Sequence, residues 1–553
     1  MEEFEERRKA RGLCGRHARS WSAVAAAVAL VSTVALGLGA ERAHSGRASG
    51  GKTLRVVMPI DLPSLDPALA RPLSYATWYA TCATLMAFRD AAGSEGLMTR
   101  PEAAAGPPKV SRNGRRYVFT VRRGLRFSDG SPLTAANFAW ALHRVLNPAM
   151  HSYWASVLSD VRGIKVDRPR LVIELTKPSG DLTTRLALPF ACPVPLDTRI
   201  DPAGVPLMVG SGPYYIAHYD ADRQLVLARN TYYRGSRPHH VNRVVMTIGG
   251  DLDADILSVE QGNADVLGIE MARDVRDRLA QQYDVNKRQL FRRFGEYTGA
   301  LVLNTSRHLF RNNVALRKAV NLAVDRTAIG RAGGGWPRWF RATDQILPRG
   351  LPAWRDYHLY PLTHPNLKRA HELANGNLRG GRAVLYTCTG KLPYSRSTCA
   401  GLTDQAVVIA QNLKRIGLDV EVKVFDVNVL FQRAAMPGEP YDMLLADFGW
   451  DYADPGNMIV PLLAGENADK TSGNSNFAYF DVPRYNREIA AADRMVGPAR
   501  FRAFSRLDAQ IMGREAPWTP LFEGSSSLFI STRVGCVKVH PVFERDYAAM
   551  CLR

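Results

Sequence analysis

The segment from Tyr117 to Pro148 constrains the fold of this 553-residue chain more than any other. Bulky apolar side chains recur at every second position from Tyr117 to Val121, which predicts a strand with one buried face. Asp129-Gly130 predicts a turn, and Thr134 after it is a suitable helix N-cap. Pro148 ends the helix that follows. The order predicted is strand, turn, short strand and helix, with no catalytic pattern.

The second half of the chain shows α/β units. Thr403 and Asp404 are expected to open a helix that Gly417 closes. Apolar and charged residues then alternate up to Val424, which predicts a half-buried strand. A second helix is expected from Asn312 or Asn313 to about Gly330. Helices next to strands in this way favour mixed sheets covered by helices.

Several blocks of sequence, in one order, resemble the solute-binding proteins of ABC importers, specifically the oligopeptide/dipeptide/nickel-binding family. One is FSDGSPLTAANF within the segment described above. The others are Thr53–Ala70 with its S-L-D-P loop, Met208–Gly235 with G-S-G-P-Y, Val302–Ile329, Tyr441–Met458 with D-Y-A-D-P, and Pro517–Val537. The resemblance is collinear from about residue 53 to residue 540, so it covers nearly the whole chain after the N-terminal segment.

The resemblance implies an α/β, two-lobed periplasmic-binding-protein fold, class II-like with mixed sheets, and an extra α/β subdomain in lobe I. Lobe I would be discontinuous, and two strands near 293–300 and 512–520 would form a hinge on which the lobes close. The implied limits are 52–70, 204–292 and 518–553 for lobe I, 71–203 for the extra subdomain, and 293–517 for lobe II, with 1–51 as leader and linker.

The N-terminal residues have the pattern of an export signal. Six basic residues between Arg7 and Arg19 precede the uncharged stretch Trp21–Ala40. This stretch is also long enough to span a bilayer, so it is either a cleaved signal peptide or a membrane anchor at 21–40. The positive charge before it places the rest of the chain outside the cytoplasm in both cases. No cysteine closely follows it, so a lipoprotein signal is not expected.

The composition is that of a globular protein with a strong positive charge. The formal net charge is +20, while 46% of the residues are hydrophobic. A basic protein can bind nucleic acid, but the sequence has neither a dense Lys/Arg stripe nor a nucleic-acid-binding motif. We therefore expect no nucleic-acid partner, and a protein that works near an anionic membrane or wall.

Six cysteines follow the leader, and an even number in an exported chain favours disulfides. Six cysteines allow 15 connectivities. The short-range candidates are Cys388–Cys399 and Cys536–Cys551, which leave Cys82 and Cys192 for each other. The alternative is that some of them are free, buried cysteines.

Asp451 is the first candidate for a ligand-binding residue. Asp451 is the first Asp of the D-Y-A-D-P segment. In peptide-binding members of the family, the Asp at this place pairs with the ammonium group of the peptide, and the resemblance implies the same role for Asp451. A carboxylate in a closing cleft can hold an ammonium through charge-assisted hydrogen bonds. The alternative is an Asp that only caps a turn. Trp450 and Tyr452 would wall the cleft or belong to the core, whereas Asp454 is expected to cap the turn.

Arg71, Pro72 and Leu73 follow the S-L-D-P loop, where peptide-binding members of the family offer backbone partners to an extended ligand. The resemblance therefore implies strand-like pairing at 71–73. The G-S-G-P-Y block is expected to be structural. His239-His240 invites a metal interpretation, but no third ligand is near in sequence, so we expect no metal and no cofactor. No G-x-S-x-G, H-E-x-x-H or Walker A motif is present, which argues against an enzyme.

The function predicted is that of an extracytoplasmic substrate-binding protein of an ABC importer. We expect the protein to be a monomer. It would capture short peptides between two lobes and deliver them to permease and ATPase subunits at the membrane. The alternatives are a non-peptide solute such as a sugar, metallophore or opine, a membrane-anchored solute sensor, and an exported hydrolase on the same scaffold.

Overall fold

The computed structural model describes residues 52–352, 354–390, 399–468 and 474–553. The predicted leader and anchor therefore lie outside the described residues. No helix among the described residues is both long and apolar enough to cross a membrane. The helices are α1 (Tyr75–Thr81), α2 (Ala135–Leu146), α3 (Trp154–Val157), α4 (Leu182–Arg185), α5 (Leu252–Glu260), α6 (Arg273–Tyr283), α7 (Val314–Ala323), α8 (Arg326–Ala332), α9 (Leu367–Ala374), α10 (Leu402–Lys414), α11 (Val427–Ala434), α12 (Gly456–Leu463), α13 (Pro483–Asp493) and α14 (Gly497–Arg514).

The structure contains three larger sheets, of five, four and six strands. A five-stranded mixed sheet has the order β11 (Val266–Leu267), β1 (Thr53–Met58), β10 (Arg243–Ile248), β9 (Gln224–Arg229) and β8 (Tyr214–Asp220). A four-stranded antiparallel sheet has the order β4 (Lys109–Val110), β5 (Arg116–Thr120), β7 (Arg170–Leu175) and β6 (Val161–Asp167). A six-stranded mixed sheet has the order β13 (Arg341–Ala342), β17 (Trp518–Phe529), β12 (Leu290–Leu303), β16 (Met443–Gly449), β14 (Arg382–Thr389) and β15 (Asp419–Asp426).

The remaining strands form small two-stranded sheets. These are β2 (Met86–Phe88) with β3 (Thr99–Pro101), β18 (Val534–Gly535) with β21 (Cys551–Leu552), and β19 (Val539–His540) with β20 (Glu544–Arg545). Parallel and antiparallel pairs occur together in both of the larger mixed sheets. The expected α/β class with mixed sheets is confirmed.

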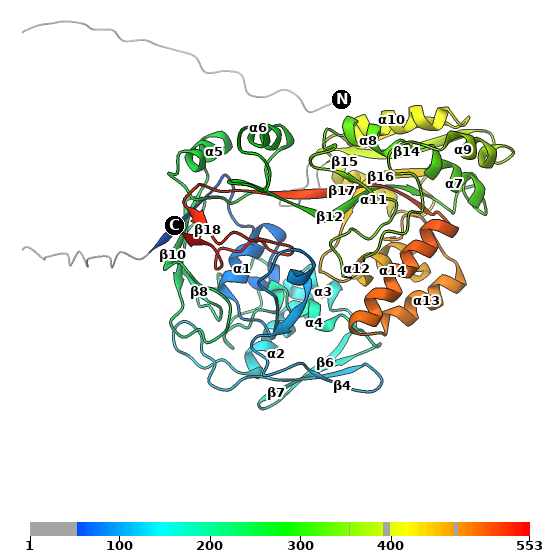
Figure 1. Cartoon of the computed structure of the whole chain (residues 1–553). Coiled ribbons are helices and arrows are strands. Elements are labelled where there is room, and N and C mark those ends of the chain that lie inside the picture. The colour runs from blue at the N-terminus through cyan, green and yellow to red at the C-terminus, as the bar shows by residue number, and fades with distance from the viewer. Residues whose placement is uncertain (1–51, 353, 391–398, 469–473) are drawn as a thin grey trace, which may run out of the picture. The chain divides into compact units, whose positions relative to one another are not determined.

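Strands β12 and β17 form a long antiparallel ribbon that connects the five-stranded and six-stranded sheets (Figure 1). At one end, Ile530 just after β17 bridges Val266 of β11. Between Phe294 and Thr298 the register shifts, and Gly295 within this bulge has a positive φ of 90°. A β-bulge bends a strand locally. The limits of the predicted lobes and the hinge stay predictions.

The segment from Tyr117 to Pro148 folds much as expected. In β5, Tyr117 and Phe119 are buried while Thr120 is exposed. Thr134 is the N-cap of α2, and Thr134 and Asn137 form a reciprocal capping box. The apolar face of α2 then packs into the main core.

A buried ion pair joins α2 to the S-L-D-P loop. Both terminal nitrogens of Arg144 donate to the carboxylate of Asp66, at 3.0 and 2.5 Å. Asp66 also accepts from the amide of Val205 at 2.8 Å, so its carboxylate is fully engaged inside the protein. Removing one partner of such a pair would leave a buried charge unpaired. The ion pair thus joins the S-L-D-P loop to the helix of the Tyr117–Pro148 segment.

Two of the predicted helices differ in the structure. The helix expected from residue 312 or 313 to 330 is two helices, because Val324 is extended and the side chain of Asp325 caps α8 by accepting from the amides of Thr327 and Ala328. Helix α10 begins at Leu402, because Gly401 adopts the left-handed conformation just before it. The strand after Gly417 forms as β15, but it is an edge strand and Val424 is exposed.

The disulfides link Cys82 to Cys192, Cys388 to Cys399 and Cys536 to Cys551. The presence of disulfides is therefore confirmed, and each pairing agrees with the one expected. Cys82 and Cys192 lie in a small apolar cluster with Trp78 and Val194. Their bridge spans 110 residues of sequence, so it restricts the unfolded chain strongly.

Candidate functional site

The candidate site is built on the loop that connects β16 to α12. Asp454 fixes this loop, because its Oδ1 accepts a hydrogen bond of 2.7 Å from the amide of Gly456, the first residue of α12. Asn457 accepts a hydrogen bond of 2.6 Å from the amide of Asp451. The loop is therefore held from within, and it presents Trp450, Asp451 and Tyr452 in fixed positions.

Asp451 is exposed, and its carboxylate is contacted from another part of the chain. The hydroxyl of Tyr153, just before α3, donates to Oδ1 of Asp451 at 2.9 Å. Burial by the surrounding protein raises the pKa of Asp451, and hydrogen bonds with Tyr153 and Asn457 oppose that rise. A carboxylate that is open to water but surrounded by protein is suited to bind a cation.

Arg71 lies over the aromatic ring of Tyr153. Its guanidinium stands 5.1 Å from the centre of the Tyr153 ring, and its side chain is exposed. The backbone amide and carbonyl of Arg71 are both engaged by the hydroxyl of Ser74. Residues Pro72–Ser74 form a short 3-10 helix, so 71–73 is not an extended strand in this structure. The side chain of Arg71, rather than its backbone, is therefore the part of this residue that is exposed beside Tyr153.

Trp450 and Tyr452 have hydrogen-bond partners in other parts of the chain than Asp451 has. The indole Nε1 of Trp450 donates to the carbonyl oxygen of Gly295 in the β12 bulge at 3.2 Å. Tyr452 is 8% exposed, and its hydroxyl donates to Oδ2 of Asp181 at 2.7 Å. Three consecutive side chains therefore contact three different regions: β12, Tyr153 and a buried ion network.

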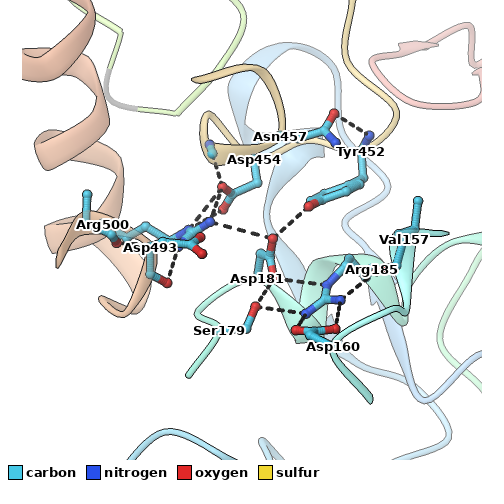
Figure 2. A network of polar contacts seen from close by, with 12 residues as sticks. Val157, Asp160, Ser179, Asp181, Arg185, Tyr452, Asp454, Asn457, Asp493 and Arg500 are labelled. Atoms are coloured by element: carbon cyan, nitrogen blue, oxygen red, sulfur yellow. Dashed lines mark hydrogen bonds and ion pairs between the residues drawn. The ribbon is translucent and has the colours of Figure 1, made fainter. Parts of the chain in front are cut away.

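Figure 2 shows this network around Asp181. In the part that follows β7, Arg185 of α4 binds both oxygens of Asp160, at 2.7 and 2.9 Å, and lies 3.0 Å from Asp181. Arg500 of α14 approaches from the opposite side, with its Nη2 3.6 Å from Oδ2 of Asp181. Burial opposes the ionisation of Asp181, but Arg185 and Arg500 outweigh it and hold the pKa of Asp181 below its ordinary value.

Arg500 completes the network within the second half of the chain. Its Nε donates to both oxygens of Asp454 at 3.0 Å, and its Nη1 donates to Oδ1 of Asp493 at 3.0 Å. Arg500 is fully buried, with 0% exposed, and Asp454 is 1% exposed. A buried guanidinium shared among three carboxylates is a structural arrangement, because little of it is available to a solute. Asp454 thus supports the loop, in line with its expected role as a turn residue.

Sequence reasoning did not single out Tyr153, Asp181 or Arg500. Tyr153 is 298 positions from Asp451, and Asp181 is 271 positions from Tyr452. Only the fold brings them together. The one available signal for Tyr153 was its position directly before Trp154, an aromatic pair after the signature helix.

The described part of the chain bears on the expected absence of a metal site. Among the described residues, no group of three or more His, Cys, Asp or Glu side chains is placed to hold a metal ion. The Nδ1 atom of His239 lies 3.1 Å from the carbonyl oxygen of Arg237, which accounts for that ring nitrogen locally. The site therefore consists of an open carboxylate, a tyrosine and an arginine, and it is suited to binding.

The fold and this site define an α/β solute-binding protein. The family model described as "Bacterial extracellular solute-binding proteins, family 5 Middle" matches residues 99–470. The chain belongs to this family, and its resemblance to ABC-importer binding proteins is confirmed. Members of the family bind solutes outside the cytoplasm and are not enzymes, and they serve transporter partners.

Individual relatives agree with this assignment. The chain is 26% identical to Protein XP55 of Streptomyces lividans over 414 residues, covering 73% of this chain and 72% of that protein. It is 24% identical to Heme-binding protein A of Haemophilus influenzae, covering 77% and 79%. The solved structure of clavulanic acid biosynthesis oligopeptide binding protein 2 has a TM-score of 0.80 and 26% identity, covering 91% of this chain and 95% of that one. The predicted periplasmic-binding-protein fold is confirmed.

Proposed function

We propose that this protein captures short peptides and delivers them to the permease of an ABC importer. The observation that carries the proposal is the Asp451 carboxylate, which is exposed and has the Tyr153 hydroxyl 2.9 Å from its Oδ1. The ammonium group of a peptide could bind between these two groups, donating hydrogen bonds to the carboxylate of Asp451 and to the hydroxyl oxygen of Tyr153. Such charge-assisted hydrogen bonds are the strong ones.

Arg71 supports a zwitterionic ligand rather than a simple cation. Its guanidinium is exposed and lies 5.1 Å from the centre of the Tyr153 ring, whose hydroxyl contacts the carboxylate. An acceptor group of the ligand, such as a peptide carbonyl or carboxylate, could bind it. A short peptide provides an ammonium and such an acceptor in one molecule.

The names of the relatives bear on the ligand in two ways. One solved neighbour is named an oligopeptide binding protein, which supports the peptide proposal. Another relative is named for haem, so members of this fold carry different solutes and the ligand must come from the site itself. Haem has no ammonium group, and the Asp451 carboxylate favours a ligand that does.

The proposed mechanism is capture, closure and docking. The ribbon formed by β12 and β17 would act as the hinge, with its bulge at residues 294–298 as the bending point. A ligand that binds the closed form better shifts the population toward it. The closed monomer, exported by its N-terminal segment or anchored through it, would then dock on the permease, and ATPase subunits would supply the energy.

Native mass spectrometry of protein purified gently from its own envelope fraction tests this proposal. A set of added masses that correspond to short peptides would support it. A single added mass of a non-peptide solute would overturn the ligand class, while the family assignment would stand. The same preparation shows whether the N-terminal segment has been removed.

A further inference from the structure

We propose a second binding site, for an amphipathic organic anion, in a cavity between the four-stranded sheet region and helices α12 and α13. The cavity has a volume of about 510 Å³, which is within the range of small-molecule sites. Its lining includes none of Arg71, Tyr153 or Asp451, so it is separate from the proposed peptide site. The inference does not rest on the proposed function.

Two separate parts of the chain build this cavity. Arg115 and Lys177 come from the loops that precede β5 and follow β7, whereas Arg494 ends α13. The cavity exists only where these parts meet. An occupant would therefore contact both of them and favour the arrangement in which they are together.

The charges that line the cavity favour an anion. Three cations (Arg115, Lys177 and Arg494) and two acids (Glu466 and Asp493) contribute to it. Each acid is already engaged: Glu466 lies 3.8 Å from Lys177, and Asp493 accepts a hydrogen bond from Arg500 at 3.0 Å. Within the residues that the structure describes, the guanidinium groups of Arg115 and Arg494 have no hydrogen-bond or ion-pair partner. These two groups leave a net positive charge for a ligand.

The rest of the lining favours a ligand with an apolar body. Pro178, Val460, Ala464 and Ile489 contribute apolar surface, and the amide side chains of Asn113 and Asn486 lie among them. An inorganic ion would leave this apolar surface wet. A molecule with a carboxylate or sulfonate on a ring or alkyl body would cover it and still meet the arginines.

Asp493 links the cavity to the buried network. It lines the cavity, and its Oδ1 accepts from Arg500, which also binds Asp454 and approaches Asp181. One wall of the cavity is therefore connected to buried ion pairs, while the guanidinium groups of Arg115 and Arg494, unpaired among the described residues, belong to exposed residues.

The anionic dye 8-anilino-1-naphthalenesulfonate is a suitable probe, because it combines a sulfonate with an aromatic body. Its fluorescence would be titrated with the purified protein and with the double variant Arg115→Gln/Arg494→Gln. The matched control is Arg116→Gln/Arg487→Gln. These two arginines are exposed and lie in the same regions of the chain, one next to Arg115 and one on α13, but neither lines the cavity. A further variant, Ala490→Trp, fills the cavity from α13.

We expect saturable binding to the wild type, a loss of affinity of about tenfold or more in the Arg115/Arg494 variant, and wild-type affinity in the control. Ala490→Trp should abolish the binding. Circular dichroism melting would verify that each variant is folded. Absence of saturable binding to the wild type, or equal affinities in the two double variants, would overturn the proposal.

Discussion

Asp451 and Asp454 lie three residues apart on one loop, and the structure gives them opposite environments. Asp451 is exposed, and one tyrosine hydroxyl contacts its carboxylate. Asp454 is 1% exposed, and both of its oxygens bind the buried Arg500. The same residue type therefore has two roles, which its surroundings determine: one carboxylate is available to a ligand, and the other stabilises the loop that presents it.

This comparison shows why a motif alone does not identify a binding residue. Both aspartates belong to the D-Y-A-D-P block, and Tyr452 between them is buried against Asp181. Burial and the nearest counter-charge separate the two cases. A binding residue must keep part of its charge unused in the ligand-free protein, and of the two aspartates only Asp451 meets this condition.

Replacing Arg500 with Met should have the largest effect. The change leaves Asp454 and Asp493 without their buried counter-charge, and breaking a buried pair in this way costs about 3–5 kcal/mol of unfolding free energy. Urea denaturation would measure it. Arg502→Met, on the exposed face of the same helix, is the control and should change stability by less than about 0.5 kcal/mol. Similar losses in both variants would show that the network is not important for stability.

Replacing Asp451 with Asn should affect binding rather than folding. Loss of the charge should weaken the binding of a free-amine peptide by about 30-fold to 150-fold, because a charge-assisted hydrogen bond contributes about 2–3 kcal/mol. The free energy of unfolding should change by less than about 1 kcal/mol, since the side chain is exposed. Isothermal titration calorimetry and urea denaturation would be compared, with the exposed Asp404→Asn as control. A large loss of stability with intact binding would reverse the roles assigned to the two aspartates.

Two tyrosine hydroxyls provide a smaller and matched comparison. Tyr452→Phe removes a buried hydrogen bond to Asp181 and should lower the unfolding free energy by about 1–2 kcal/mol. Tyr153→Phe removes an exposed contact with Asp451, so it should leave stability nearly unchanged and alter peptide affinity a few-fold. In denaturation, Tyr452→Phe should therefore have the larger effect, whereas in calorimetry Tyr153→Phe should have the larger effect. Equal effects of both changes on stability would contradict it.

The smallest expected effect is a dependence of binding on pH. Only the ionised carboxylate of Asp451 attracts an ammonium, and burial raises its pKa. Affinity should therefore fall as the pH decreases, and the fall should begin at a higher pH than for an ordinary aspartate, whose pKa is about 3.9. Calorimetry at pH 7.5 and pH 5 should show weaker binding at pH 5. Asp451→Asn should remove this difference, and a variant that retains it would assign the titration to another group.

The sequence predicts those parts of the fold that depend on local patterns. The alternation at 117–121, the cap at Thr134 and the disulfide pairs all appear in the structure. The errors were also local. A capping aspartate, Asp325, divides one predicted helix, and a left-handed Gly401 moves the start of another.

The site was predictable only in part. The resemblance pointed to Asp451, and the structure gives this residue an exposed carboxylate, although its role in binding stays a prediction. Tyr153 and Arg500 could not be predicted, because their partners are distant in sequence and their contacts depend on how the parts pack. Tyr452 was expected either at the cleft wall or in the core, and its buried contact with Asp181 could not be predicted, because no local pattern connects the two residues.

The most direct test is a binding cycle on the Asp451 carboxylate. A peptide recovered from the purified protein would be synthesised with a free and with an acetylated amino terminus, and both forms would be titrated into wild type and Asp451→Asn. The account predicts that acetylation weakens binding to the wild type by about 30-fold or more, and that it has little further effect in Asp451→Asn. Equal affinity of the wild type for both peptides would contradict the claim that Asp451 recognises the ammonium group.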